Sequence, residues 1–139
     1  MGVVYHANYL NWFEIGRTEL IREMGVPYRS IEEKGLLLPV VDAEIKYRLP
    51  ARYDDELVVC TRIAAFSHVR MEFESQVCRI LAEQASSGES YEQRDEPFGQ
   101  LLVSGRTRHM WLNGQWKPAR LDREAPELYA LLKQNVNEA

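Results

Sequence analysis

The chain has 139 residues, of which 45% are hydrophobic and 27% are charged, as expected for one globular domain with a single core. A net charge of −4 argues against nucleic acid as the main partner. The sequence has no apolar run long enough for a membrane span and no pattern of a secretory signal, so we expect a cytoplasmic protein.

The first predicted element is a long helix. It starts at Asn8, a good N-cap residue, and ends before Gly25, which suits the position just after a helix. Helical spacing connects an apolar stripe made of Tyr9, Phe13, Gly16, Leu20 and Met24. Leu10, Ile15 and Ile21 broaden this stripe, so we expect a central, mostly buried helix. Gly16 lowers helix stability, and we expect it to be there because another backbone approaches closely.

The next elements are a short helix over 28–34 and then segments with a period near two, which predicts strands. We expect strands at 36–48, with a break at Pro39, and at 56–66, 70–81 and 101–112. Asn113 and Gly114 indicate a tight turn, and 123–135 has the pattern of a final amphipathic helix. The polar segment 83–99 is predicted to be a surface loop, and its role stays open. One long helix followed by antiparallel strands predicts an α+β domain.

The two cysteines give no sign of a metal or redox site. Cys60 and Cys78 lie in apolar, strand-like segments, and the sequence has no CxxC pair and no Cys/His cluster. We interpret both as small core residues, and we predict no metal and no cofactor.

The first seventeen residues carry most of the functional information. Their pattern consists of Gly2, Val3, Val4, Tyr5, His6, Ala7, Asn8, Tyr9, Trp12, Phe13, Glu14 and Arg17, followed downstream by YRLPARYDD at 47–55. This pattern resembles the hot-dog-fold acyl-CoA thioesterases of the 4-hydroxybenzoyl-CoA thioesterase-like family, and the resemblance covers nearly the whole chain. It implies one domain over 1–139, in which an antiparallel sheet wraps around a long central helix, and a homodimer or homotetramer. It also implies hydrolysis of a small or medium acyl- or aroyl-CoA thioester by water.

The chain departs from this family at its start. In the family the catalytic carboxylate lies three residues before the glycine that matches Gly2, whereas here only Met1 precedes it. The resemblance therefore implies that a catalytic Asp and a first strand lie upstream of the given start. A non-catalytic acyl-CoA-binding hot-dog domain is the alternative. An Asp codon two positions before Met1 would favour the enzyme, and a stop codon there would favour the binding domain.

The resemblance also assigns roles at the start of the helix. The backbone N–H of His6, in the loop that begins at Tyr5, is the expected oxyanion donor, because free N–H groups and the positive end of the helix dipole stabilise negative charge. The His6 side chain either contacts the ligand or only satisfies local structure. Asn8 is favoured as a cap over a catalyst. Glu14 is favoured as a structural or substrate-orienting residue over a catalytic one, and it either faces the pocket or pairs with Arg17.

The remaining candidates bind substrate. We expect contacts from Asn8, Tyr9, Trp12, Arg48 and Arg70. Cationic candidates for the CoA phosphates are Lys46, Arg48, Arg52, Arg70, Arg106 and Arg108. The acyl pocket would be walled by Trp12, Phe13 and the run 36–39, although plain core packing is the stronger interpretation of Phe13 and an equally good one of Trp12.

Overall fold

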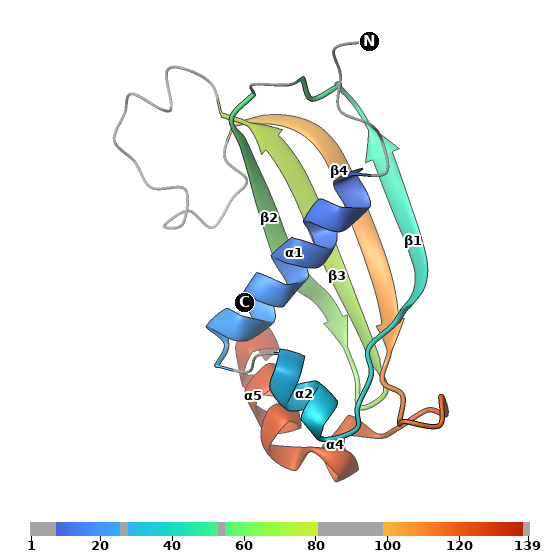
Figure 1. The fold of residues 1–139 in the computed structure, drawn as a ribbon. Helices are drawn as coiled ribbons and strands as arrows, with labels where there is room; N and C mark the ends of the chain where they lie inside the picture. The colour runs from blue at the N-terminus through green and yellow to red at the C-terminus, as the bar shows by residue number, and fades with distance from the viewer. Residues whose placement is uncertain (1–7, 26–27, 53–54, 81–98, 138–139) are drawn as a thin grey trace.

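The computed structural model describes residues 8–25, 28–52, 55–80 and 99–137. Its helices are α1 (Asn8–Glu23), α2 (Tyr28–Glu33), α4 (Leu121–Glu124) and α5 (Pro126–Asn137). Its strands are β1 (Val40–Tyr47), β2 (Leu57–Phe66), β3 (Arg70–Arg79) and β4 (Gln100–Met110). The strands form one antiparallel sheet in the order β1-β4-β3-β2. Helix α1 lies across one face of this sheet, and α2, α4 and α5 gather at one end (Figure 1). The α+β prediction is confirmed.

The predicted elements agree with the structure, with two corrections. The first predicted strand, 36–48, was too long, because β1 starts only after Pro39 and Leu37 forms just an isolated bridge to Leu112. The predicted C-terminal helix is two helices, α4 and α5, divided at Ala125. Pro126 has no N–H to continue a helix but suits the first position of a new one, which explains the division. The predicted loop 83–99 lies outside the described residues except for Gly99.

The sheet has two unlike faces, because side chains alternate along each strand. On β3, Met71, Phe73, Ser75 and Val77 are buried toward α1, whereas Glu72, Glu74 and Gln76 face the other side. We call the side toward α1 the inner face and the opposite side the outer face. This alternation is the one that the sequence predicted.

The core has two main clusters on the inner face. One lies at the N-terminal end of α1 and consists of Tyr9, Phe13, Ala51, Val77, Leu102 and Val103. The other lies toward the C-terminal end of α1 and contains Ile21, Ile31, Leu36, Met71, Phe73 and Trp111, together with residues of α4 and α5. The ends of the sheet are therefore chemically distinct, since α2, α4 and α5 cover only one of them.

Helix α1 is less buried than the sequence predicted. Its buried residues are Tyr9, Phe13, Arg17 and Ile21, which form a single stripe with a spacing of four. Leu10 and Ile15 are exposed, at 43% and 60%. The expectation of a mostly buried helix was therefore wrong for this single chain, because only one sheet face packs against α1.

Gly16 allows the close packing of α1 on the sheet, but not against a backbone. A Cβ atom at Gly16 would lie 2.4 Å from the Thr61 Oγ1 atom and 3.2 Å from a methyl group of Val59. The approaching atoms are therefore side chains of β2, which corrects the prediction.

Candidate functional site

An aromatic cluster joins the start of α1 to the end of β1. Tyr9 is 2% exposed, and its hydroxyl accepts a hydrogen bond from the Ala51 N–H at 3.2 Å. The ring of Tyr9 meets Trp12 at 5.1 Å and Tyr47 at 5.5 Å between centroids, both in near-perpendicular geometry. Trp12 is half-buried and Tyr47 is 52% exposed. Tyr9 therefore holds two partly accessible rings at this end of the molecule.

The other predicted residues of the helix start are only partly described. Tyr5 and His6 lie outside the described residues. Asn8 is the first residue of α1 and is exposed, and the first turn of the helix contains no acidic residue. The positive end of the helix dipole is therefore not neutralised within its own turn. Glu14 is exposed.

The residues expected to wall an acyl pocket lie in the core instead. Phe13 is fully buried and Leu36 is 2% exposed, each in a different cluster. These two residues therefore pack the fold, and Trp12 is the residue of that predicted wall that stays partly accessible near the helix start.

The structure does not bring Arg48 and Arg70 together. Tyr47, next to Arg48, pairs with Val103 of β4, whereas Arg70 pairs with Met110. Seven residues of an extended strand separate those two points, which is about 23 Å. Within one chain, Arg48 and Arg70 therefore lie at opposite ends of the sheet.

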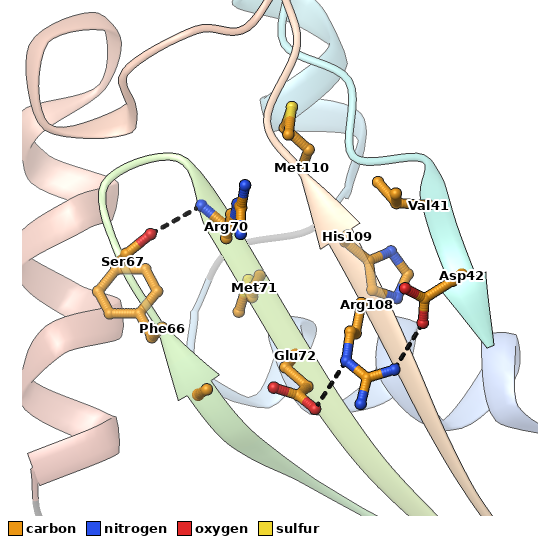
Figure 2. A pocket seen from close by; sticks show the side chains of 11 residues that line it. Val41, Asp42, Phe66, Ser67, Arg70, Met71, Glu72, Arg108, His109 and Met110 are labelled. Carbon is orange, nitrogen blue, oxygen red and sulfur yellow. Dashed lines mark hydrogen bonds and ion pairs between the residues drawn. The ribbon is translucent and has the colours of Figure 1, made fainter. Parts of the chain in front are cut away.

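A cavity of about 450 Å³ lies at the Arg70 end, beside the hairpin between β2 and β3 (Figure 2). Its lining includes Val41, Asp42, Ala65, Phe66, Ser67, Arg70, Met71, Glu72, Arg108, His109 and Met110. The main-chain N–H of Arg70 donates to the Ser67 Oγ at 2.9 Å, and the exposed Arg70 guanidinium has no ion-pair partner among the described residues. The cavity thus combines apolar lining with one cation that is available to a ligand.

Arg106 and Arg108 are occupied by carboxylates. Arg108 lies between Asp42, at 2.7 Å, and Glu72, at 3.3 Å, as Figure 2 shows. Its hydrogen bond to Asp42, and then that to Glu44, raises the pKa of Arg108. Arg106 pairs with Glu72 at 3.1 Å and also with Glu74. Of the arginines predicted for phosphate contacts, these two are already neutralised.

His109 is a buried polar residue that the sequence analysis did not select. It is 3% exposed, and its Nε2 lies 2.9 Å from the Thr107 Oγ1 atom. Its Nδ1 lies 3.3 Å from the carbonyl oxygen of Leu38, which can only accept, so Nδ1 carries the proton. Burial, with a further contribution from the nearby Arg17 guanidinium, lowers the pKa of His109 to about 4. The sequence could have revealed this buried position, because His109 alternates with its neighbours on β4 in the same way as the inward-facing residues of the strand.

The described residues hold no cluster of His, Cys, Asp and Glu that could bind a metal ion, and none of their helices is long and apolar enough to cross a membrane. Cys60 and Cys78 are free, and burial raises the pKa of the Cys78 thiol to about 11. A thiol with this pKa is not a nucleophile at neutral pH.

A family profile and individual sequence relatives of this chain point to the same protein family. The sequence profile of the thioesterase-like superfamily matches residues 1–128. The Bacillus subtilis protein YneP, named as an acyl-CoA thioesterase, is 32% identical over 128 residues, which cover 91% of this chain and 80% of YneP. The Haemophilus influenzae acyl-CoA thioesterase YbgC is 37% identical over 79 residues, which cover 56% of this chain and 58% of YbgC.

Solved structures of two further proteins share the fold. The crystal structure of a DHNA-CoA thioesterase from Staphylococcus aureus superposes with a TM-score of 0.79 and 28% identity, over 99% of this chain and 84% of that one. A Thermus thermophilus protein, TT1821, gives a TM-score of 0.76 and 30% identity, over 96% and 87% of the two chains. The sheet and its helix therefore match as one unit.

Proposed function

Because the chain belongs to the thioesterase-like superfamily, we propose that it hydrolyses a small or medium acyl- or aroyl-CoA thioester with water. The observation that carries this proposal is the match of nearly the entire chain to a DHNA-CoA thioesterase structure, together with a relative named as an acyl-CoA thioesterase. The reaction is an acyl transfer to water, which needs donors for the developing oxyanion and an acid residue to activate water or attack the thioester.

The N-terminal end of α1 is the proposed place of the reacting carbonyl. Its first-turn N–H groups have no intrahelical acceptors, and no carboxylate in that turn opposes the dipole. In this proposal the main-chain N–H of His6 is the oxyanion donor and Tyr5 leads into that loop. Trp12 and Tyr47 contact the acyl group, and the exposed Glu14 orients substrate.

The cavity beside Arg70 is the proposed place of a CoA phosphate. A phosphate needs a cation that is not already paired, and Arg70 meets this condition whereas Arg106 and Arg108 do not. The apolar lining of the cavity suits the adenosine. We also propose that the protein is a cytoplasmic homo-oligomer, and its free cysteines suit a reducing compartment.

Hydrolysis of acetyl-, hexanoyl- and benzoyl-CoA, followed by thiol release, tests the activity. The assay compares this chain with a version that is extended upstream of Met1. A well-folded extended protein that binds these thioesters but releases no CoA above background would overturn the proposal in favour of a binding domain.

The role of Arg70 is tested by Arg70→Ala. We expect a KM for acyl-CoA that is higher by about tenfold, because a charge-assisted bond to phosphate is lost. Hydrolysis of a thioester of N-acetylcysteamine, which has no phosphate, should not change. Arg123→Ala, which removes another exposed arginine on α4, is the matched control and should leave both substrates unaffected.

A further inference from the structure

The cavity beside Arg70 also contains a carboxylate, which has no role in the binding of a phosphate. Glu72 lies two residues after Arg70 on the same face of β3, and both side chains line the cavity (Figure 2). Two residues of an extended strand span about 7 Å, so a cation and an acid lie next to each other in one wall. A ligand that fills the cavity therefore meets both charges.

The two carboxylate oxygens of Glu72 have different surroundings. The Oε1 atom is buried and lies 3.1 Å from the Arg106 Nη1 atom and 3.3 Å from the Arg108 Nε atom. Both ion pairs use this one oxygen, so the two arginines hold the carboxylate in place. The Oε2 atom points away from Arg108, toward the strand that ends at Phe66 (Figure 2). Oε2 is therefore the oxygen that faces a ligand.

The neighbours of Glu72 across the sheet leave space on this side. Glu72 pairs with Arg108 of β4 on one side and with Ala65 of β2 on the other. Ala65 lines the cavity with a single exposed methyl group, and Val41 and Met110 add further apolar lining. The volume of about 450 Å³ lies in the usual range for sites that bind small organic ligands. An apolar cavity of this size with one acceptor in its wall suits a flat base that carries a donor.

We propose that the Glu72 Oε2 atom accepts a hydrogen bond from the exocyclic amino group of adenine, so that the cavity selects adenine among purine bases. This inference rests on the proposed function, in which Arg70 binds a CoA phosphate. In CoA the phosphates are attached to the ribose, and the amino group lies at the far edge of the base. A carboxylate only accepts, so it matches this amino group but not the carbonyl oxygen that guanine or hypoxanthine has at the same position.

Asp42, the other acid of the cavity, is less suited to this contact. Its Oδ1 atom pairs with Arg108 at 2.7 Å, and its side chain is 54% exposed. The Glu72 side chain is only 19% exposed. A hydrogen bond to an enclosed charge discriminates more strongly, because water cannot replace the bond when the ligand lacks the donor. Glu72 is therefore the acid that reads the base.

Isothermal titration calorimetry with adenosine 3′,5′-bisphosphate and inosine 3′,5′-bisphosphate tests this contact. The two nucleotides share the ribose and both phosphates, and inosine has a carbonyl oxygen in place of the amino group. The wild type should bind the adenosine compound at least about tenfold more tightly. Glu72→Gln should bring this ratio of Kd values close to one, because an amide offers an acceptor to adenine and a donor to hypoxanthine.

Three further variants separate the base contact from other effects. Glu74→Gln is the matched control, because Glu74 lies on the same face of β3 and also pairs with Arg106 but is not part of the cavity lining, so it should keep the wild-type ratio. Arg70→Ala should weaken both nucleotides by the same factor, since a phosphate contact does not distinguish bases. Ala65→Leu fills the space beside Glu72 without removing its ion pairs and should weaken the adenosine compound by at least about tenfold.

Equal binding of the two nucleotides by the wild type contradicts this inference, and so does a ratio that changes as much in Glu74→Gln as in Glu72→Gln. Absence of binding by both nucleotides contradicts it together with the phosphate role of Arg70. Thiol release measures hydrolysis separately. A protein that hydrolyses acyl-CoA without a preference for adenine keeps the proposed activity and loses this inference, whereas one that prefers adenine but releases no CoA does the reverse.

Discussion

The two faces of the sheet are built by different forces. On the inner face, the Phe13 ring of α1 fills the space above Gly105 of β4, so neither position has room for a larger side chain. On the outer face, arginines and carboxylates alternate across the strands, from Asp42 through Arg108 to Glu72. Close packing is intolerant of added volume, whereas exposed ion pairs contribute little to stability. The comparison indicates that packing on the inner face contributes more to the stability of the fold than the ion pairs of the outer face.

The largest expected effect comes from adding one carbon atom to the inner face. A Cβ at residue 105 would lie 2.3 Å from the Phe13 Cε2 atom and 2.8 Å from its Cζ atom. Because Phe13 is fully buried, we expect Gly105→Ala to lower the free energy of unfolding by about 3 kcal/mol. Urea denaturation measures this change.

Two variants control for that result. Gly114→Ala adds the same atom in the turn after β4, where nothing lies within 4 Å, and should change stability by less than about 0.5 kcal/mol. Phe13→Leu combined with Gly105→Ala should be less destabilised than the sum of the two single variants, because the smaller side chain relieves the overlap. Additive effects would show that this contact does not limit the packing.

The second-largest effect is a pH dependence of the free energy of unfolding, which arises from a histidine buried on the inner face. Burial, and then Arg17, lowers the pKa of His109 from 6.5 to about 4. Above pH 6.5 the imidazole is neutral in the folded and unfolded states. As the pH falls from 6.5 toward 4, only the unfolded chain takes up the proton, so the free energy of unfolding decreases. We expect a loss of about 2 kcal/mol from this residue between pH 7 and pH 5.

His109→Gln removes this titration and keeps a donor and an acceptor at the site. Its free energy of unfolding should therefore change less between pH 7 and pH 5 than that of the wild type. His68→Gln, at an exposed position in the turn before β3, should retain the wild-type slope. Equal slopes in all three proteins would show that His109 is protonated as readily in the folded chain as in the unfolded one.

The sequence could predict the faces of single strands but not how they meet. The alternation of apolar and polar residues on β3 predicted that Phe73 faces the core and Glu74 faces away from it, because successive side chains of a strand point to opposite faces. It could not reveal that Arg17 would be buried beside His109, because this depends on which stripe of α1 contacts the sheet.

The candidate site was less predictable than the fold. Asp42 and Arg108 line one cavity although 66 residues separate them, and only the strand order brings them together. The same order sets Arg48 apart from Arg70, which the sequence had grouped as substrate-binding residues. Charge type is a local property of the sequence, but the partner of each charge is set by register.

The smallest effect is expected on the outer face, from the ion pair between β2 and β3. The Arg62 Nε donates to the Glu74 Oε2 at 2.7 Å, and this bond, with a smaller contribution from Arg106, lowers the pKa of Glu74. The Arg62 side chain is 77% exposed, so solvent and salt screen its charge. We expect Arg62→Gln to lower the free energy of unfolding by less than about 1 kcal/mol, and the difference from wild type to shrink further in 0.5 M salt. If Arg62→Gln instead destabilised the protein as much as Gly105→Ala, charge would hold the fold together as strongly as packing does, and the contrast between the two faces would be lost.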